Sequence, residues 1–173
     1  WRYTLNYTYT DAKLEDPVYR ADHPNNPAFL RAAAGTKLPG TPENSVSGSL
    51  DYTMAVMGGR SWMNGINASY RSSTENSILT NPASQTTRFK RTWDGFTLVN
   101  FVSTLAADKW SASLYVKNVF NEEGVTGGFL EPHMGADTLV PPGVPEQNYV
   151  GNGSKQFISL PRTFGVTFSY DFR

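Results

Sequence analysis

Apolar and polar residues alternate one by one along several stretches of this chain. From Trp1 to Tyr9 every second residue is aromatic or aliphatic, and the residues between them are Arg, Thr or Asn. A period of two puts all the apolar side chains on one face of a β-strand, whereas an amphipathic helix needs a period of 3.6 residues. Similar alternation predicts strands at residues 44–57, 60–73 and 163–172 and from residue 110 onward. The alternation is weaker at residues 60–73 than in the other stretches.

A sixth strand is predicted at residues 92–107, but the pattern leaves its faces open. Residues 96–102 are nearly all apolar, with Asn100 as the main exception, so no period of two stands out there. The sequence therefore predicts six strands and assigns the faces of five.

The connections between these strands alternate between long and short. Residues 13–43, 74–91 and 122–160 are long and rich in Pro, Gly, Asn and Ser, whereas residues 58–59 and 107–109 are short turns. Gly58-Gly59 suits a two-residue hairpin turn because glycine accepts positive φ. In an up-and-down antiparallel sheet, successive connections lie at opposite ends. All three long loops therefore share one end, and both short turns and both termini share the other.

This one-sided arrangement is typical of transmembrane β-barrels, which have short periplasmic turns and long extracellular loops. A strand that crosses a bilayer has about 9–11 residues, and all six predicted strands are expected to reach that length. The sequence thus predicts an all-β fold, an antiparallel up-and-down transmembrane barrel segment. A soluble β-sandwich has the same alternation and is the competing fold, although loops longer than about 15 residues are uncommon in soluble domains.

The composition fits a barrel wall. Aromatic residues make up 13% of the chain and charged residues 17%, below the roughly 25% charged residues of an average soluble domain. Aromatic side chains in a barrel gather at the two membrane interfaces. The predicted girdle consists of Trp1, Tyr9, Trp62, Tyr70, Trp110 and Phe172. No run of about 18 apolar residues exists, so no transmembrane helix is predicted.

Charged residues on the predicted polar faces are candidates for the barrel interior. They are Asp51, Arg71, Lys117 and Asp171. They could line a substrate path or contact a domain inside the barrel, but barrel interiors are polar and hydrated in any case. The sequence leaves both interpretations open.

Aromatic and imidazole groups in the polar loops are candidates for ligand binding. They are Phe29, Trp93, Phe129, His133 and Tyr149. Aromatic rings offer a large contact area at low entropic cost, but packing of one loop on another explains them equally well. In the first of these loops, residues 27–34 fit either two helical turns or an irregular segment.

The sequence shows no sign of catalysis, of a cofactor or of a nucleic-acid partner. Fifteen basic and fifteen acidic residues cancel, and neither a Ser/His/Asp arrangement nor a phosphate-binding glycine loop is present. The two histidines, His23 and His133, lie in long loops of the same end. A metal site needs three or four ligands, so we expect ordinary loop histidines, no metal and no enzyme.

Four segments resemble the final strands of TonB-dependent outer-membrane receptors. They are residues 7–13, 38–52, 110–123 and 161–172. The third of these contains the Asn-Val-Phe-Asn ending at residues 118–121. The last of the four is also similar to the signal that the outer-membrane assembly machinery recognises, with Thr163, Gly165, Phe168 and Tyr170 at the signal positions. The family usually ends on an aromatic residue, whereas here Arg173 follows Phe172.

The resemblance implies that residues 1–173 are the C-terminal part, about six strands, of a 22-stranded barrel. It implies a bacterial outer-membrane location with periplasmic termini and extracellular loops. The partners would be membrane lipid, the remaining strands, an N-terminal plug absent from this chain, TonB and the barrel assembly machinery. The expected function is TonB-energised uptake of a scarce small-molecule nutrient, above all a siderophore–iron complex. Cobalamin or oligosaccharide uptake, a passive porin-like channel and a barrel enzyme are the alternatives.

Overall fold

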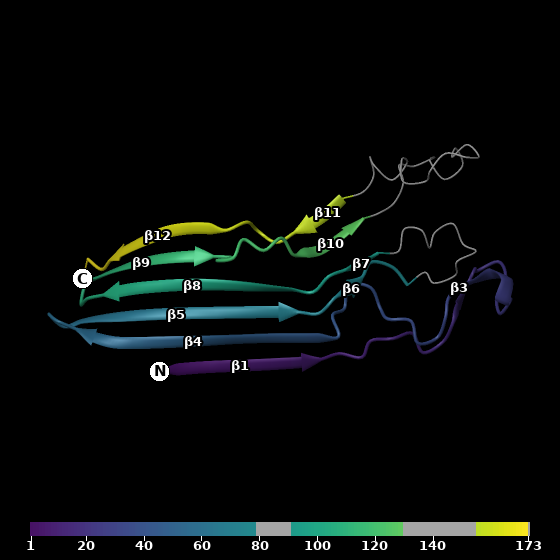
Figure 1. The fold of residues 1–173 in the computed structure, drawn as a ribbon, viewed down its shortest axis with the longest axis horizontal. Helices are drawn as coiled ribbons and strands as arrows, with labels where there is room; N and C mark the ends of the chain where they lie inside the picture. The colour runs from purple at the N-terminus through teal and green to yellow at the C-terminus, as the bar shows by residue number, and fades with distance from the viewer. Residues whose placement is uncertain (79–90, 130–154, 173) are drawn as a thin grey trace.

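The computed structural model describes residues 1–78, 91–129 and 155–172, and its main feature is one six-stranded antiparallel sheet (Figure 1). The strands are β1 (Arg2–Tyr9), β4 (Asn44–Val56), β5 (Arg60–Arg71), β8 (Phe96–Ala106), β9 (Trp110–Lys117) and β12 (Thr163–Tyr170). They lie in the order β1-β4-β5-β8-β9-β12, so each pairs with the next of the six along the chain. The predicted all-β, antiparallel, up-and-down arrangement is therefore confirmed. The described residues do not close it into a barrel.

Shorter elements extend the long connections. They are β2 (Val18–Tyr19), the 3-10 helix η1 (Pro27–Phe29), β3 (Leu30–Ala32), β6 (Thr74–Glu75), β7 (Thr92–Trp93), β10 (Val125–Phe129) and β11 (Lys155–Ile158). The small strands pair as three ribbons, β2-β3, β6-β7 and β10-β11. All three ribbons lie at the end of the sheet opposite both termini (Figure 1). The long connections therefore leave the sheet at one end, as their lengths predict.

One face of the sheet is apolar from its first strand to its last. Residues that are register partners on adjacent strands share a face. A single row of partners across the six strands is Tyr3, Leu50, Ile66, Phe101, Val116 and Phe164. A row on the opposite face contains Thr4, Ser49, Asn67 and Asn100. We call these the apolar face and the polar face.

The register also assigns the faces of β8, which the sequence left open. Its apolar-face residues are Thr97, Val99, Phe101, Ser103 and Leu105. The polar face receives Leu98 and Val102 as well as Asn100, because these pair with Ser69, Gly65 and Asn67 of β5. Apolar residues therefore occupy both faces of β8, which explains why its alternation is blurred.

Two local expectations from the sequence are wrong. The strand predicted at residues 92–107 begins at Phe96, since Thr92–Trp93 form β7 and pair with β6. The turn between β4 and β5 has three residues, 57–59, because Val56 pairs with Arg60. Both of its glycines have the expected positive φ, +80° at Gly58 and +69° at Gly59.

For residues 27–34 the sequence left two helical turns and an irregular segment open, and the structure does not have the two helical turns. Only Pro27–Phe29 is helical, as one 3-10 turn capped by the Asn26 side chain, which accepts a hydrogen bond from the backbone N–H of Ala28. The following residues form β3, which pairs with β2. Tertiary pairing therefore overrides the helical tendency of this alanine-rich segment.

Three strands of the sheet are shorter than predicted. β1, β9 and β12 have eight residues each, which corresponds to about 26 Å of extended chain. β9 ends at Lys117 because Asn118 adopts a φ of +51°, which extended strands do not use. Single backbone hydrogen bonds lengthen the pairing, from Thr10 N to Glu43 O and from Asp171 N to Lys109 O.

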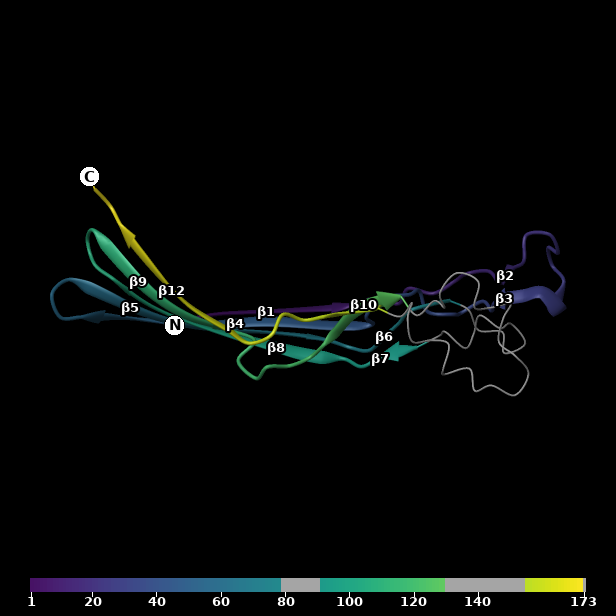
Figure 2. The same cartoon turned by 90° about the horizontal axis from the view of Figure 1, so that it is seen from above.

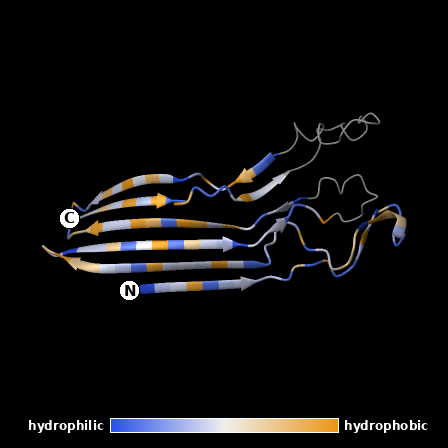
Figure 3. Cartoon of the chain, in the orientation of Figure 1, coloured by the Kyte–Doolittle hydropathy of each residue, from blue (hydrophilic) through white to orange (hydrophobic). Residues whose placement is uncertain are grey.

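The apolar face is not covered by another layer within the described residues. Figure 2 shows the sheet as one twisted layer, and Figure 3 shows hydrophobic and hydrophilic residues in alternation along the strands. Tyr3 is 82% exposed and Val166 74% exposed, and the only buried apolar side chains described are Ala32 and Trp93. A sandwich would bury this face against a second sheet, and none packs there among these residues. In the same residues, no helix is long and apolar enough to cross a membrane.

Candidate functional site

The polar face meets the long loops at a cluster around Arg71, the last residue of β5. Its Nη2 donates to the carbonyl of Val125 at 2.8 Å and contacts the hydroxyl of Thr74 at 3.4 Å. Its guanidinium lies over the ring of Phe96, 4.8 Å from the ring centroid. A Cβ on Gly124 would lie 2.3 Å from that ring, so the chain at residue 124 lies directly against Phe96. Arg71 and Phe96 therefore fix the start of β10 over the polar face.

Trp93, a predicted ligand-binding residue, is only 7% exposed. It belongs to β7, and a Cβ on Gly128 of β10 would lie 3.2 Å from its Cζ2 atom. The indole therefore packs between the ribbons β6-β7 and β10-β11. Its buried N–H has no acceptor among the described residues. This placement matches loop-on-loop packing better than an exposed contact for a ligand.

Phe29 lies in a separate cluster in the first long loop. The His23 ring stacks on it at a centroid distance of 3.9 Å, and the guanidinium carbon of Arg20 lies 5.3 Å from its centroid. Arg20 also pairs with Asp22, with its Nε 2.6 Å from Oδ1 of the carboxylate. We call Arg20, Asp22, His23 and Phe29 the loop-1 cluster.

The ion pair of the loop-1 cluster gives a pH prediction. The hydrogen bond from Arg20 lowers the pKa of Asp22 to about 2. Because the folded pKa is depressed, the pairing is intact above the ordinary carboxyl value and is lost as the pH falls through about 2. We expect Arg20→Gln to return the pKa of Asp22 to about 3.9, as followed by carboxyl carbon shifts of labelled aspartate. Arg31→Gln is the control, and an unshifted Asp22 titration in Arg20→Gln would contradict the assignment.

Of the five predicted ligand-binding residues, the structure describes Phe29, Trp93 and Phe129, which belong to three different elements, η1, β7 and β10. Phe129 ends β10, where it pairs with Lys155, whereas His133 and Tyr149 lie outside the described residues. Within residues 1–78, 91–129 and 155–172, no group of three or more His, Cys, Asp or Glu residues could hold a metal ion. The Nε2 atom of His23 lies 3.7 Å from Oδ2 of Asp22, the preceding residue.

The predicted interior residues lie on four different strands or strand ends of the polar face. Asp51 pairs with Arg2 and Gly65, Lys117 pairs with Thr163, and Asp171 follows the end of β12. A Cβ on Gly65 would lie 2.7 Å from Oδ1 of Asp51, so this glycine leaves room for the carboxylate. These residues therefore lie at separate positions along the face.

A buried polar network that the sequence does not predict as a site surrounds Asn118. Asn118 is buried and donates through Nδ2 to the carbonyls of Glu122 at 2.9 Å and Leu160 at 2.8 Å. Its Oδ1 accepts from the backbone N–H of Glu122 at 2.8 Å. Ser159 adds a hydrogen bond from its hydroxyl to the same Glu122 carbonyl at 2.6 Å. We call this the Asn118 clasp, and it ties the chain after β9 to the chain before β12.

The sequence signal for the clasp is the Asn-Val-Phe-Asn stretch. Asn118 and Asn121 both have positive φ, +51° and +55°, a conformation that asparagine tolerates better than most residues. Asn121 accepts a hydrogen bond from the backbone N–H of Arg162. The stretch resembles the family's strand ending, but sequence spacing does not show that its side chains bond with Leu160 and Arg162, about 40 positions away.

Gly165, in the predicted assembly signal, has a packing role on the polar face. The ring of its register partner Tyr115 lies across it, and a Cβ there would be 2.2 Å from the Tyr115 hydroxyl oxygen. Thr163 shares this face, whereas Phe168 and Tyr170 lie on the apolar face, paired with Ala112 and Trp110. The four residues therefore divide between the two faces.

This packing predicts the effect of a larger residue at position 165. Gly165→Val should displace the Tyr115 ring and destabilise the folded protein by about 1–3 kcal/mol. Ser169→Val is the matched control, because Ser169 lies on the same face and strand opposite the small Ser111. Thermal unfolding in detergent measures both, and equal stability of the two variants would show that the ring does not depend on the glycine.

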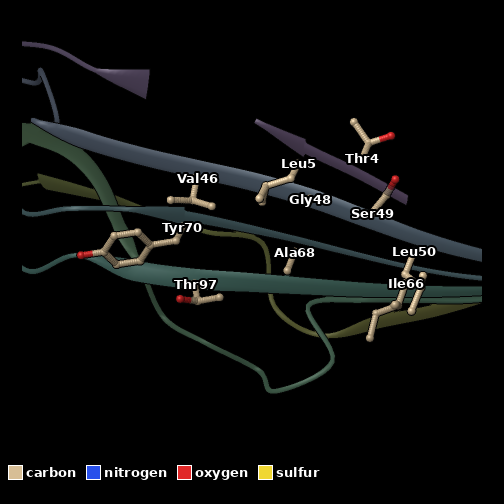
Figure 4. A pocket seen from close by; sticks show the side chains of 10 residues that line it. All are labelled: Thr4, Leu5, Val46, Gly48, Ser49, Leu50, Ile66, Ala68, Tyr70 and Thr97. Atoms are coloured by element: carbon tan, nitrogen blue, oxygen red, sulfur yellow. The ribbon is translucent and has the colours of Figure 1, made fainter. Parts of the chain in front are cut away.

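The apolar face contains a hollow of about 340 Å³ over β1, β4 and β5 (Figure 4). Gly48 and Ala68, which are register partners, form its centre because neither has a large side chain. Leu50 and Ile66 lie on one side of them and Tyr70 on the other. The hollow suits an apolar chain, in keeping with the rest of this face.

The predicted girdle residues of the strands all fall on the apolar face. Their register partners lie on the same face: Asn44 for Tyr9, Met54 for Trp62, Val46 for Tyr70 and Tyr170 for Trp110. At the chain ends, the ring centroids of Trp1 and Tyr52 are 4.4 Å apart, and those of Phe172 and Tyr170 are 4.9 Å apart. Aromatic residues therefore occur on this face at both ends of the sheet.

No protein-family model, curated protein or solved structure matches this chain.

Proposed function

We propose that this chain is part of the wall of a bacterial outer-membrane β-barrel, with the apolar face toward lipid and the polar face toward the interior. The observation that carries the proposal is the exposed apolar face, which continues over all six strands. Exposed apolar patches on soluble monomers rarely exceed about 300–600 Å². A bilayer covers such a face, and the antiparallel ladder satisfies the backbone groups that lipid cannot.

The edges of the sheet support a larger assembly. Among the described residues, β1 pairs only with β4 and β12 only with β9, so each has one free edge. A free edge is not tolerated in the hydrocarbon layer. We therefore propose that other strands of the same barrel pair with both edges. The figure of 22 strands rests on the resemblance to TonB-dependent receptors.

The polar face favours a receptor over an open channel. Most of its side chains are short and uncharged, such as Ser47, Ser69, Ser113 and Thr167. Short neutral side chains leave room for a folded plug close to the wall. The proposed activity is TonB-energised uptake of a nutrient, with a siderophore–iron complex as the first candidate. In this arrangement the three ribbons lie at the outer surface of the membrane.

Two measurements test this proposal in the full-length protein. We expect it in the urea-resistant outer-membrane fraction, and recovery in the soluble fraction would rule out the barrel. We also expect deletion of its gene to abolish growth on at least one ferric siderophore, and loss of TonB to have the same effect. Uptake that persists without TonB would favour the porin-like channel instead.

A further inference from the structure

Arg60 is an exception on the apolar face. Among the described strand residues of this face, it is the only charged one. It begins β5 directly after the three-residue turn, at the short-turn end of the sheet. A guanidinium among apolar side chains has a cost unless it reaches water or a partner of opposite charge. The position therefore requires an anionic or aqueous neighbour.

The guanidinium of Arg60 lies over one aromatic ring, that of Trp110. Its guanidinium carbon lies 5.9 Å from the centroid of the Trp110 ring. The backbone N–H of Ala107 donates to the carbonyl of Trp110, and Ala107 follows Ala106, the register partner of Ser61. Trp62 follows two positions later on the same face. Within the described residues Arg60 takes part in no ion pair.

A second polar group lies further along the same face of β5. The Trp62 indole N–H donates to the Ser103 hydroxyl at 2.8 Å, and that hydroxyl donates to Oδ1 of Asn64 at 2.8 Å. The Nδ2 group of Asn64 has no acceptor among the described residues. Asn64 lies about 13 Å from Arg60 along the strand, deeper in the proposed membrane. The face thus offers a cation near its edge and a neutral donor further in.

We propose that Arg60, Trp110 and Asn64 bind one glycerophospholipid of the periplasmic leaflet, an inference that rests on the proposed function. The guanidinium binds the phosphate, for which its planar fork is suited. The rings of Trp110 and Trp62 contact the glycerol region, where amphipathic rings are favoured. The Asn64 amide donates to an ester carbonyl, which lies deeper than the phosphate. The site recognises a phosphodiester joined to acyl esters.

Native mass spectrometry of the full-length protein tests this site. Protein released from mild detergent is titrated with phosphatidylglycerol, with a neutral diacylglycerol and with inorganic phosphate. We expect saturable binding of phosphatidylglycerol, weakened about tenfold in Arg60→Gln and partly retained in Arg60→Lys. Asn64→Leu is expected to weaken it several-fold. Lys109→Gln is the matched control, because it removes one positive charge from the other short turn, and it should bind like the wild type.

The outcomes separate this site from the proposed function. If Arg60→Gln inserts in the outer membrane and binds phosphatidylglycerol as tightly as the wild type, the lipid site is wrong and the barrel stands. Equal binding of diacylglycerol, or competition by inorganic phosphate alone, also overturns the site. If the wild-type protein is recovered as a soluble protein, the barrel and the site fail together.

Discussion

Arginine in place of Leu5 is expected to destabilise the protein by about 2–4 kcal/mol in a bilayer, as arginine near the midplane of a barrel's lipid face does. Leu5 lies near the middle of β1, pairs with Gly48 and is 74% exposed. A side chain so exposed makes few contacts, so in water its replacement would cost little. The expected loss therefore arises from desolvation of the guanidinium in lipid. Equilibrium unfolding in lipid vesicles measures it.

Thr4→Arg is the matched control for Leu5→Arg. Thr4 is the neighbouring residue of β1, pairs with Ser49 and is also exposed, but it lies on the polar face. We expect its stability to stay within about 0.5 kcal/mol of the wild type. If the two arginine variants are equally stable, or if Thr4→Arg is the more damaging, the apolar face does not contact lipid.

The second large effect is expected from Asn118→Gly, which should lower the free energy of unfolding by about 3 kcal/mol or more. Glycine keeps the positive φ of this position but removes the three side-chain hydrogen bonds to Glu122 and Leu160. Each buried partner left unsatisfied costs about 1–3 kcal/mol. Because the clasp holds the chain between β9 and β12, the variant should also expose the β10-β11 ribbon to protease. Thermal unfolding in detergent and limited proteolysis measure the two effects.

Asn121→Gly is the control for the clasp. Asn121 has nearly the same φ, but it is exposed and its side chain accepts one hydrogen bond, from Arg162. We expect a loss of about 1 kcal/mol. An Asn118→Gly variant as stable as Asn121→Gly would show that the clasp does not hold the loop.

The sequence predicts the sheet well wherever the two faces differ in polarity. β1 alternates fully from Arg2 to Tyr9, so its faces and its place in the meander follow directly. In β8 the polar face includes Leu98 and Val102, so only pairing with β5 could assign its faces. The lengths of the connections were sufficient to place the loops at one end.

The candidate site was less predictable because it depends on contacts between distant segments. Trp93 looks like an exposed loop aromatic in the sequence, yet Gly128 of the β10-β11 ribbon, much later in the chain, packs on it. The Asn118 clasp depends on a left-handed backbone and on the return of the chain at Ser159. Arg60 was part of a strand with weak alternation, and only the register placed it alone on the apolar face.

A spin-label scan along β1 tests the central proposal most directly. Residues 1–173 contain no cysteine, so single cysteines at positions 3 to 8 can be labelled in lipid vesicles once any cysteine elsewhere in the full-length protein has been replaced by serine. We predict that labels at Tyr3, Leu5 and Tyr7 are relaxed by oxygen, which dissolves in lipid, and are shielded from a water-soluble nickel complex. Labels at Thr4, Asn6 and Thr8 should show less oxygen access. Uniform access to the nickel complex at all six positions would contradict the account.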